Sequence, residues 1–183
     1  MERTEIRLAG AGGQGVILAS VILADAAVRA GRYACQTQSY GPEARGGACK
    51  AEAVISDEKI AYPEVTDPVL VMALTQKAAD KYIRNLRPDA IVVADSRVVL
   101  PDEAVNNKLY KLPILDTAEK EIGKAVTANM VAAGVINHIL GICPIEKLAE
   151  TVRSRVPKGT EEINVKALMA GNDMKLETAD EHS

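Results

Sequence analysis

The sequence predicts a single-domain α/β fold in which helices flank a largely parallel, Rossmann-like sheet. At the N-terminus, an alternating apolar run, a glycine-rich turn and a helical pattern follow one another within residues 5–24. Two short, continuously apolar runs, at 68–74 and 90–94, are typical of buried parallel strands. The chain has 183 residues and 48% hydrophobic residues, which is enough for one core. We expect the domain to span residues 1–176 and a polar tail to span 177–183.

The first unit is a strand, a turn and a helix. Glu5–Ala9 alternates as a strand, and residues 10–15 read Gly-Ala-Gly-Gly-Gln-Gly. A helix is predicted from Gly15 to about Ala30, because Gly31 is a typical residue for ending it. An extended segment then follows at 33–39.

The middle of the chain continues the α/β pattern. A loop with three glycines and a proline occupies residues 40–47, and 48–56 alternates like a half-exposed strand. A connector at 56–67 leads to the buried strand at 68–74, and Thr75 can cap a helix at 76–86. Further strands are predicted at 90–94 and 109–114. Helical stretches are predicted at 118–123, 125–140, 144–155 and 160–174.

Composition excludes several classes of function. The net charge of −3 and the scattered basic residues disfavour nucleic-acid binding. No apolar run approaches the roughly 20 residues needed to cross a membrane, so we expect a cytoplasmic protein. The three cysteines form no C-x-x-C pair and are expected to be small buried hydrophobes. We find no catalytic pair and no metal-ligand cluster, so we assign no catalytic residue and no metal site.

The glycine turn is the strongest candidate site. A strand, a glycine turn and a helix in this order direct backbone N–H groups and the positive end of a helix dipole at one point, which suits an anion. Gly10, Gly12 and Gly15 also fit G-x-G-x-x-G, but no acidic residue follows at 33–39, where a dinucleotide-binding fold requires one. A P-loop is excluded because Gly-Lys-Ser/Thr is absent. A tight turn without a ligand remains the alternative.

Two motifs together resemble a known family. Gly12-Gly13-Gln14-Gly15 followed by a helix, and Ser-Tyr-Gly-Pro-Glu-Ala-Arg-Gly-Gly at 39–47, are similar to the gamma subunit of the 2-oxoacid:ferredoxin oxidoreductases. The resemblance continues through residues 55–67 and returns at Asn129-Met130-Val131 with Gly134. The loop sequence and the short chain look more like the 2-oxoglutarate or branched-chain types than the pyruvate type. We favour the 2-oxoglutarate type, and indolepyruvate oxidoreductase stays open.

This resemblance implies a subunit of a thiamine-diphosphate enzyme that forms acyl-CoA, CO2 and reduced ferredoxin from a 2-oxoacid. The complex is expected to use thiamine diphosphate, Mg2+, iron–sulfur clusters and coenzyme A, of which this chain alone holds none. The implied partners are alpha and beta subunits, with or without a delta subunit, and ferredoxin through the complex. The isolated chain is expected to be inactive, and to self-associate or expose an apolar face.

Site residues follow from the motifs combined with this resemblance. We expect the glycine turn and Arg45 to contact coenzyme A or another anion, with the Gln14 amide as a donor. The residues expected to contact the ligand are Gly12, Gly13, Gln14, Gly15 and Arg45. The residues expected at a subunit interface are Tyr40, Pro42, Glu43, Gly46 and Gly47.

Alternatives remain for these residues and for the whole chain. Arg45 can instead form an ion pair with Glu43 within its own loop. Asn129 can bridge to the glycine turn or face solvent, and Asp95 can bind a ligand or cap a turn. For the whole chain, the alternatives are a free-standing Rossmann-type nucleotide-binding protein and a purely structural subunit.

Overall fold

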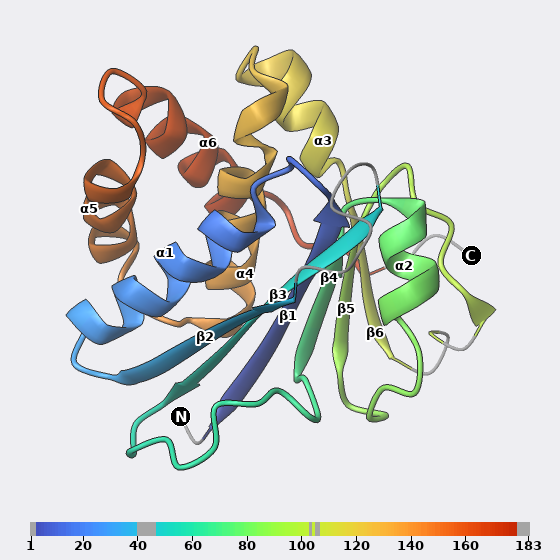
Figure 1. Cartoon of the computed structure of the whole chain (residues 1–183). Coiled ribbons are helices and arrows are strands. Elements are labelled where there is room, and N and C mark those ends of the chain that lie inside the picture. The colour runs from blue at the N-terminus through green and yellow to red at the C-terminus, as the bar shows by residue number, and fades with distance from the viewer. Residues whose placement is uncertain (1–2, 40–46, 103, 105–106, 179–183) are drawn as a thin grey trace.

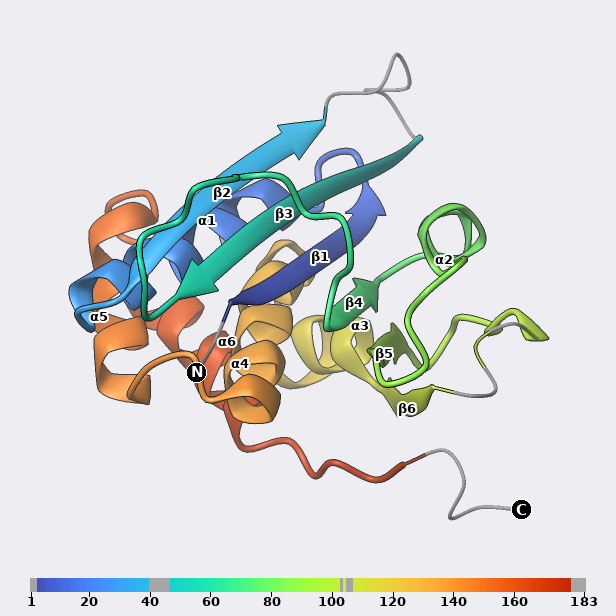
Figure 2. The same ribbon diagram turned by 90° about the horizontal axis from the view of Figure 1, so that it is seen from below.

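The computed structural model describes residues 3–39, 47–102, 104 and 107–178, and contains one six-stranded sheet (Figures 1 and 2). The strands lie in the order β2-β3-β1-β4-β5-β6, and all of them except β3 run in one direction. The strands are β1 (Thr4–Ala11), β2 (Tyr33–Ser39), β3 (Ala48–Ser56), β4 (Leu70–Ala73), β5 (Ile91–Asp95) and β6 (Lys108–Leu112). The prediction of a mostly parallel α/β sheet is therefore confirmed.

Strand β3 makes the sheet mixed. It lies between β1 and β2 and runs antiparallel to both, whereas in the usual dinucleotide-binding order the second strand lies beside the first. The prediction that β3 is half exposed is wrong, because residues 51–56 are buried. Its polar residues alternate for another reason: Glu52 accepts hydrogen bonds from Arg7 at 2.6 Å and from Lys50 at 3.0 Å within the sheet. The two half-buried cations compensate the carboxylate of Glu52, which is why that residue can be buried within the sheet.

Helices cover the two faces of the sheet unequally (Figure 1). Four of them pack on one face, where they share the larger core with alternate strand residues such as Ile6, Leu8 and Met72. The other face is covered by α2 (Gln76–Tyr82), which packs on Val71 and Val92. The four helices are α1 (Val16–Arg29), α4 (Ala128–Leu140), α5 (Ile145–Arg155) and α6 (Glu161–Asn172). No helix in the described ranges is both long and apolar enough to span a membrane.

The segment after β6 differs from the prediction. The strand ends at Leu112 instead of Ile114, because Pro113 follows and cannot donate to a ladder. Short helical turns then run through α3 (Ile114–Asp116), a π-helical turn (Thr117–Glu121) and a 3-10 turn (Ala125–Thr127), so helix starts earlier than the predicted 118. Most of the expected polar tail, residues 179–183, lies outside the described residues.

Helices α4 and α6 cross with their backbones almost in contact. A Cβ atom added to Gly134 would lie 2.1 Å from the carbonyl oxygen of Leu168, and one added to Gly171 would lie 2.0 Å from that of Val131. Only glycine fits at such an approach, because real Cβ contacts are never this short. This crossing fixes α4, whose first turn reaches the candidate site.

Candidate functional site

The glycine turn joins the carboxyl end of β1 to the first turn of α1. Gly13 and Gly15 have φ angles of +88° and +74°, in the left-handed region that favours glycine. The Gln14 N–H donates to the carbonyl of Ala11 at 3.1 Å, and the Gln14 side-chain oxygen accepts from the Ala11 N–H at 2.7 Å. This pair of bonds closes the turn, so the side-chain carbonyl of Gln14 has a structural role that the sequence did not indicate.

Gly10 is needed for the same arrangement. A Cβ atom there would lie 2.5 Å from Oε1 of Gln14 and 3.1 Å from Cγ1 of Val16. The first glycine of the G-x-G-x-x-G spacing therefore makes room for the side chain of Gln14. The predicted role of the Gln14 amide as a donor falls on its Nε2 atom, for which no hydrogen bond is present within the described ranges.

The N-terminus of α1 has no side-chain cap. Gly15 is the N-cap residue, the first turn holds no acidic side chain, and the first helical bond runs from the Ala19 N–H to the Gly15 carbonyl at 3.1 Å. The N–H groups at the start of a helix without a cap remain available to an acceptor, and the helix dipole favours a negative one. Among the described residues, the side of the turn at Gly13 is open: Gly13 is exposed, and a Cβ atom there would meet no atom of these residues within 4 Å.

Asn129, in the first turn of α4, contacts the glycine turn although it is 114 residues from Gly15 in the sequence. Its Nδ2 donates to the Gly15 carbonyl at 3.2 Å, and a Cβ atom on Gly15 would lie 2.5 Å from that nitrogen. Asn129 is 5% exposed, so of the two alternatives the structure selects the bridge to the glycine turn and not the solvent-facing one. Its Oδ1 atom is buried and has no hydrogen-bond partner among the residues that the structure describes, which is uncommon for a buried polar atom.

The loop predicted to contact a ligand and a neighbouring subunit begins and ends beside this turn. The Gly12 N–H donates to the carbonyl of Gly47 at 3.3 Å, so the last residue of the loop lies against the glycine turn. Ser39 pairs with Lys50 and Ala11 pairs with Ala48, which places both ends of the loop at the carboxyl end of β1. The other predicted loop residues, Tyr40, Pro42, Glu43, Arg45 and Gly46, lie outside the described residues.

The remaining candidates have structural roles. Asp95 is fully buried and accepts hydrogen bonds from the N–H groups of Arg97 at 3.0 Å and Leu115 at 2.8 Å. Of its two predicted roles, the structure therefore shows the capping of a turn.

Cys143 is buried, as predicted, and burial raises its pKa to about 11. Cys35 and Cys49 are only half-buried, so the prediction fails for them: Cys35 lies in the edge strand β2, and Cys49 packs against the larger core from near the start of β3 without being enclosed by it. Within the described ranges, no three His, Cys, Asp or Glu residues come together as a metal site.

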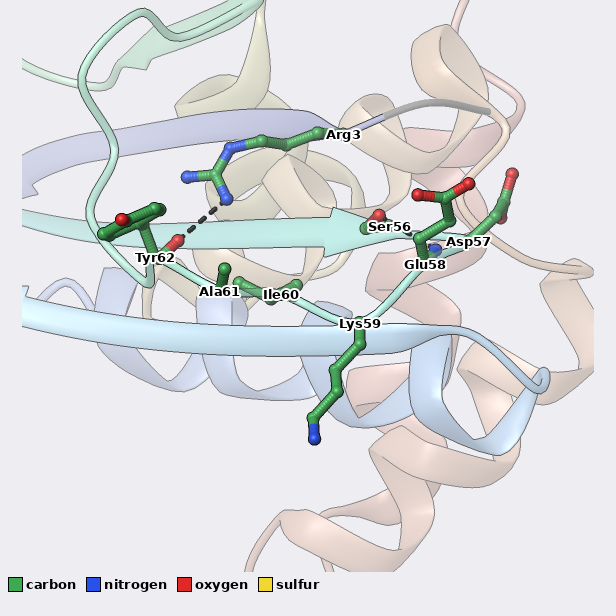
Figure 3. Close-up of a pocket in the computed structure, with 8 residues that line it drawn as sticks. All are labelled: Arg3, Ser56, Asp57, Glu58, Lys59, Ile60, Ala61 and Tyr62. Carbon is green, nitrogen blue, oxygen red and sulfur yellow. Dashed lines mark hydrogen bonds between the residues drawn. The ribbon is translucent and has the colours of Figure 1, made fainter.

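A cavity of about 650 Å³ lies at the opposite end of the sheet (Figure 3). It is lined by Arg3 and residues 56–62 of the connector between β3 and β4. Arg3 donates to the carbonyls of Tyr62 and Glu64 and to Glu5, each at 2.8 Å, and so holds the connector against β1. Burial raises the pKa of Glu5, but hydrogen bonds from the Asp67 and Thr66 N–H groups and from Arg3 outweigh it, leaving that pKa below its ordinary value. These partners belong to the fold, and none of them points to a ligand.

Known proteins match this chain along nearly its whole length. Residues 5–174 match the family described as pyruvate ferredoxin/flavodoxin oxidoreductase. The 2-oxoglutarate synthase subunit KorC of Methanothermobacter marburgensis is 42% identical over 182 residues, which cover 96% of this chain and 98% of the relative. The pyruvate synthase subunit PorC of Thermotoga maritima is 29% identical over 177 residues, covering 91% and 92%.

Solved structures agree in fold. The gamma subunit of a keto/oxoacid ferredoxin oxidoreductase from Geobacter sulfurreducens superimposes with a TM-score of 0.83 at 41% identity, covering 93% of this chain and 95% of that one. The 2-oxoglutarate:ferredoxin oxidoreductase from Magnetococcus marinus, solved with 2-oxoglutarate, coenzyme A and succinyl-CoA bound, contains the same fold, with a TM-score of 0.84 at 22% identity. That match covers 94% of this chain and 31% of the longer one. The chain thus belongs to the pyruvate ferredoxin/flavodoxin oxidoreductase family, as the gamma subunit of a 2-oxoacid:ferredoxin oxidoreductase.

Proposed function

We propose that this chain is the coenzyme A-contacting subunit of a 2-oxoglutarate:ferredoxin oxidoreductase and that the contact is made at the glycine turn. The observation that carries the proposal is the N-terminus of α1, which has no side-chain cap among the described residues and follows directly on the exposed Gly13. The phosphates of coenzyme A are the anionic group of the reaction that this geometry suits. The 2-oxoglutarate type is favoured because KorC relatives reach 43% identity, against 29% for PorC of Thermotoga maritima.

In this proposal the chain's own residues bind and orient, and the bonds of the reaction change elsewhere. The glycine turn holds a phosphate group, Arg45 adds a charge-assisted contact from the neighbouring loop, and Tyr40, Pro42, Glu43, Gly46 and Gly47 face another subunit. Thiamine diphosphate with Mg2+ and the iron–sulfur clusters reside on the alpha, beta or delta subunits of a cytoplasmic complex, where decarboxylation and electron transfer to ferredoxin take place. The isolated chain should therefore show no 2-oxoacid oxidation with an artificial electron acceptor and no iron–sulfur absorbance.

The test uses the assembled enzyme and a pair of glycine variants. Gly13→Val places a side chain on the open side of the turn, so it should raise the coenzyme A concentration needed for half-maximal rate at least tenfold. CO2 release from 2-oxoglutarate should stay close to that of the unmodified enzyme. Removing Arg45 with Arg45→Ala should have the same effect more mildly, because a charge-assisted bond contributes roughly 1.5–3 kcal/mol.

Gly31→Val is the matched control. Gly31 lies just beyond the other end of α1 with a φ of +87°, and a Cβ atom there also meets nothing within 4 Å. It therefore carries the same backbone strain without lying at the turn. If Gly13→Val and Gly31→Val enzymes need the same amount of coenzyme A, the turn is a structural feature and the proposal is wrong.

A further inference from the structure

Helix α4 contains two buried asparagines that differ in how completely they are bonded. Asn129, in its first turn, and Asn137, toward its end, are each 5% exposed. Both ends of the Asn137 amide are bonded: Nδ2 donates to the Cys143 carbonyl and Oδ1 accepts from the Cys143 N–H, each at 3.1 Å. Asn129 is bonded at one end. Its Nδ2 donates to the Gly15 carbonyl at 3.2 Å, and its Oδ1 has no hydrogen-bond partner among the described residues.

The stability of the fold does not account for Asn129. The Gly15 carbonyl already accepts the first helical bond of α1, from the Ala19 N–H at 3.1 Å, so it does not need a second donor. The residues that follow Asn129, Met130 and Val131, are apolar and 0% exposed. A buried polar atom without a partner costs free energy that an apolar side chain at the same position avoids. Residues that break such a rule are expected where function requires them.

The bond from Asn129 restrains a backbone that is otherwise free to change direction. The carbonyl that it reaches belongs to the peptide between Gly15 and Val16, where the chain enters α1. The turn has glycine at positions 13 and 15, both with positive φ, and glycine loses more conformational freedom on ordering than any other residue. Holding the carbonyl fixes the plane of that peptide, and a second bond to the same carbonyl also polarises the peptide unit. The Asn129 amide therefore orders the turn before a ligand reaches it.

We propose that Asn129 is a positioning residue: it holds the glycine turn in the conformation that accepts a phosphate group of coenzyme A. This inference rests on the proposed function of that turn. A site that is already ordered binds more tightly, because the ligand does not have to supply the free energy of ordering it. Asn129 is itself buried and acts through the Gly15 carbonyl. Its orphaned Oδ1 is the cost of placing a donor at this position.

The test compares alanine variants of the two asparagines in the assembled enzyme. Isothermal titration calorimetry with coenzyme A, in the absence of 2-oxoglutarate, measures the dissociation constant directly. Asn129→Ala should raise it about fivefold, the equivalent of one neutral hydrogen bond, and Asn137→Ala should leave it unchanged. In steady-state kinetics, Asn129→Ala should change the coenzyme A concentration for half-maximal rate rather than the maximal rate, because the residue contacts no reacting atom.

Stability should rank the two variants in the opposite order. Asn137→Ala leaves the N–H and the carbonyl of Cys143 without these bonds in a buried part of the chain. Asn129→Ala removes the orphaned oxygen and leaves the Gly15 carbonyl bonded to Ala19. The urea midpoint of the purified full-length chain should therefore fall further for Asn137→Ala. A merely structural role for both residues cannot produce opposite orders in stability and in affinity.

A third variant separates the hydrogen bond from the space that alanine leaves. Asn129→Val fills more of that space but cannot donate, so it should bind coenzyme A as weakly as Asn129→Ala. The inference is overturned if either Asn129 variant binds coenzyme A as tightly as the unmodified enzyme while Gly13→Val binds it more weakly; the proposed function then stands. Equal weakening by Asn137→Ala also overturns it. If no variant weakens binding, Gly13→Val included, the proposed function itself is wrong.

Discussion

Glycines serve two opposite purposes at the α4–α6 crossing and at the turn after β1. Gly134 and Gly171 have a neighbouring backbone where a side chain would be, with the closest atom 2.0–2.1 Å from the added Cβ. At the same position, Gly13 has no atom of the described residues within 4 Å, and within this part of the chain only its φ of +88° requires a glycine. The first pair closes a contact inside the molecule, whereas Gly13 leaves a surface open. A glycine of the first kind indicates packing, and one of the second kind indicates a surface that something else can approach.

Helix α4 connects these two regions. It contacts α6 through Gly134 and the glycine turn through Asn129, within the same thirteen-residue helix. Displacing α4 at the crossing should therefore disturb the turn, while changes at Gly13 should stay local.

The largest effect is expected for Gly171→Ala. The added methyl group meets the Val131 backbone, which cannot turn aside as a side chain can, so the helices must separate. Overpacking of this kind costs about 3 kcal/mol in the free energy of unfolding, after the better helix propensity of alanine is included. Urea denaturation of the purified chain measures it. Lys166→Ala, on the exposed side of α6, is the control and should change stability by less than about 0.5 kcal/mol.

A smaller loss is expected for Gly15→Ala. Its φ of +74° costs an alanine about 1–2 kcal/mol, and the new methyl group pushes on the Asn129 amide. Because a side-chain amide can move away, the clash should cost less than at Gly171. The clash is absent in the double variant Gly15→Ala/Asn129→Ala. This double variant should therefore lose less free energy of unfolding than the sum of the losses measured for the two single variants. Strictly additive losses would show that Asn129 does not restrain the turn.

The smallest loss is expected for Gly13→Ala. No atom lies in the way, so only the left-handed backbone is penalised, by about 1 kcal/mol. Gly13→Asn should recover most of it, since asparagine tolerates this conformation better than alanine. Thermal unfolding of both variants makes the comparison. A loss at Gly13 as large as that at Gly171 would contradict the distinction between open and closed glycines.

The sequence predicted the parts of this molecule that depend on local patterns. The turn at 10–15, the helix after it and the buried strands at 70–73 and 91–95 follow from glycine positions and apolar runs. The interior position of β3 could not be predicted, because Lys50 and Glu52 alternate as surface residues do. The buried Glu52 is compensated by Lys50 and by Arg7, a partner more than forty residues away in the sequence. The structural role of Gln14 depends on the conformation of its side chain, which no spacing reveals.

The reversed direction of β3 has a consequence for how such a subunit can diversify. Because β3 runs against β1, the β2–β3 hairpin must open at the same end of the sheet as the glycine turn, as the contact between Gly12 and Gly47 records. Hairpin tips accept substitutions and insertions with little effect on the strands that carry them. Substitutions between Ser39 and Gly47 should therefore leave the backbone geometry of the glycine turn unchanged. A single reversed strand thus brings the connection between β2 and β3 to the same end of the sheet as the glycine turn, although the two are encoded by separate segments.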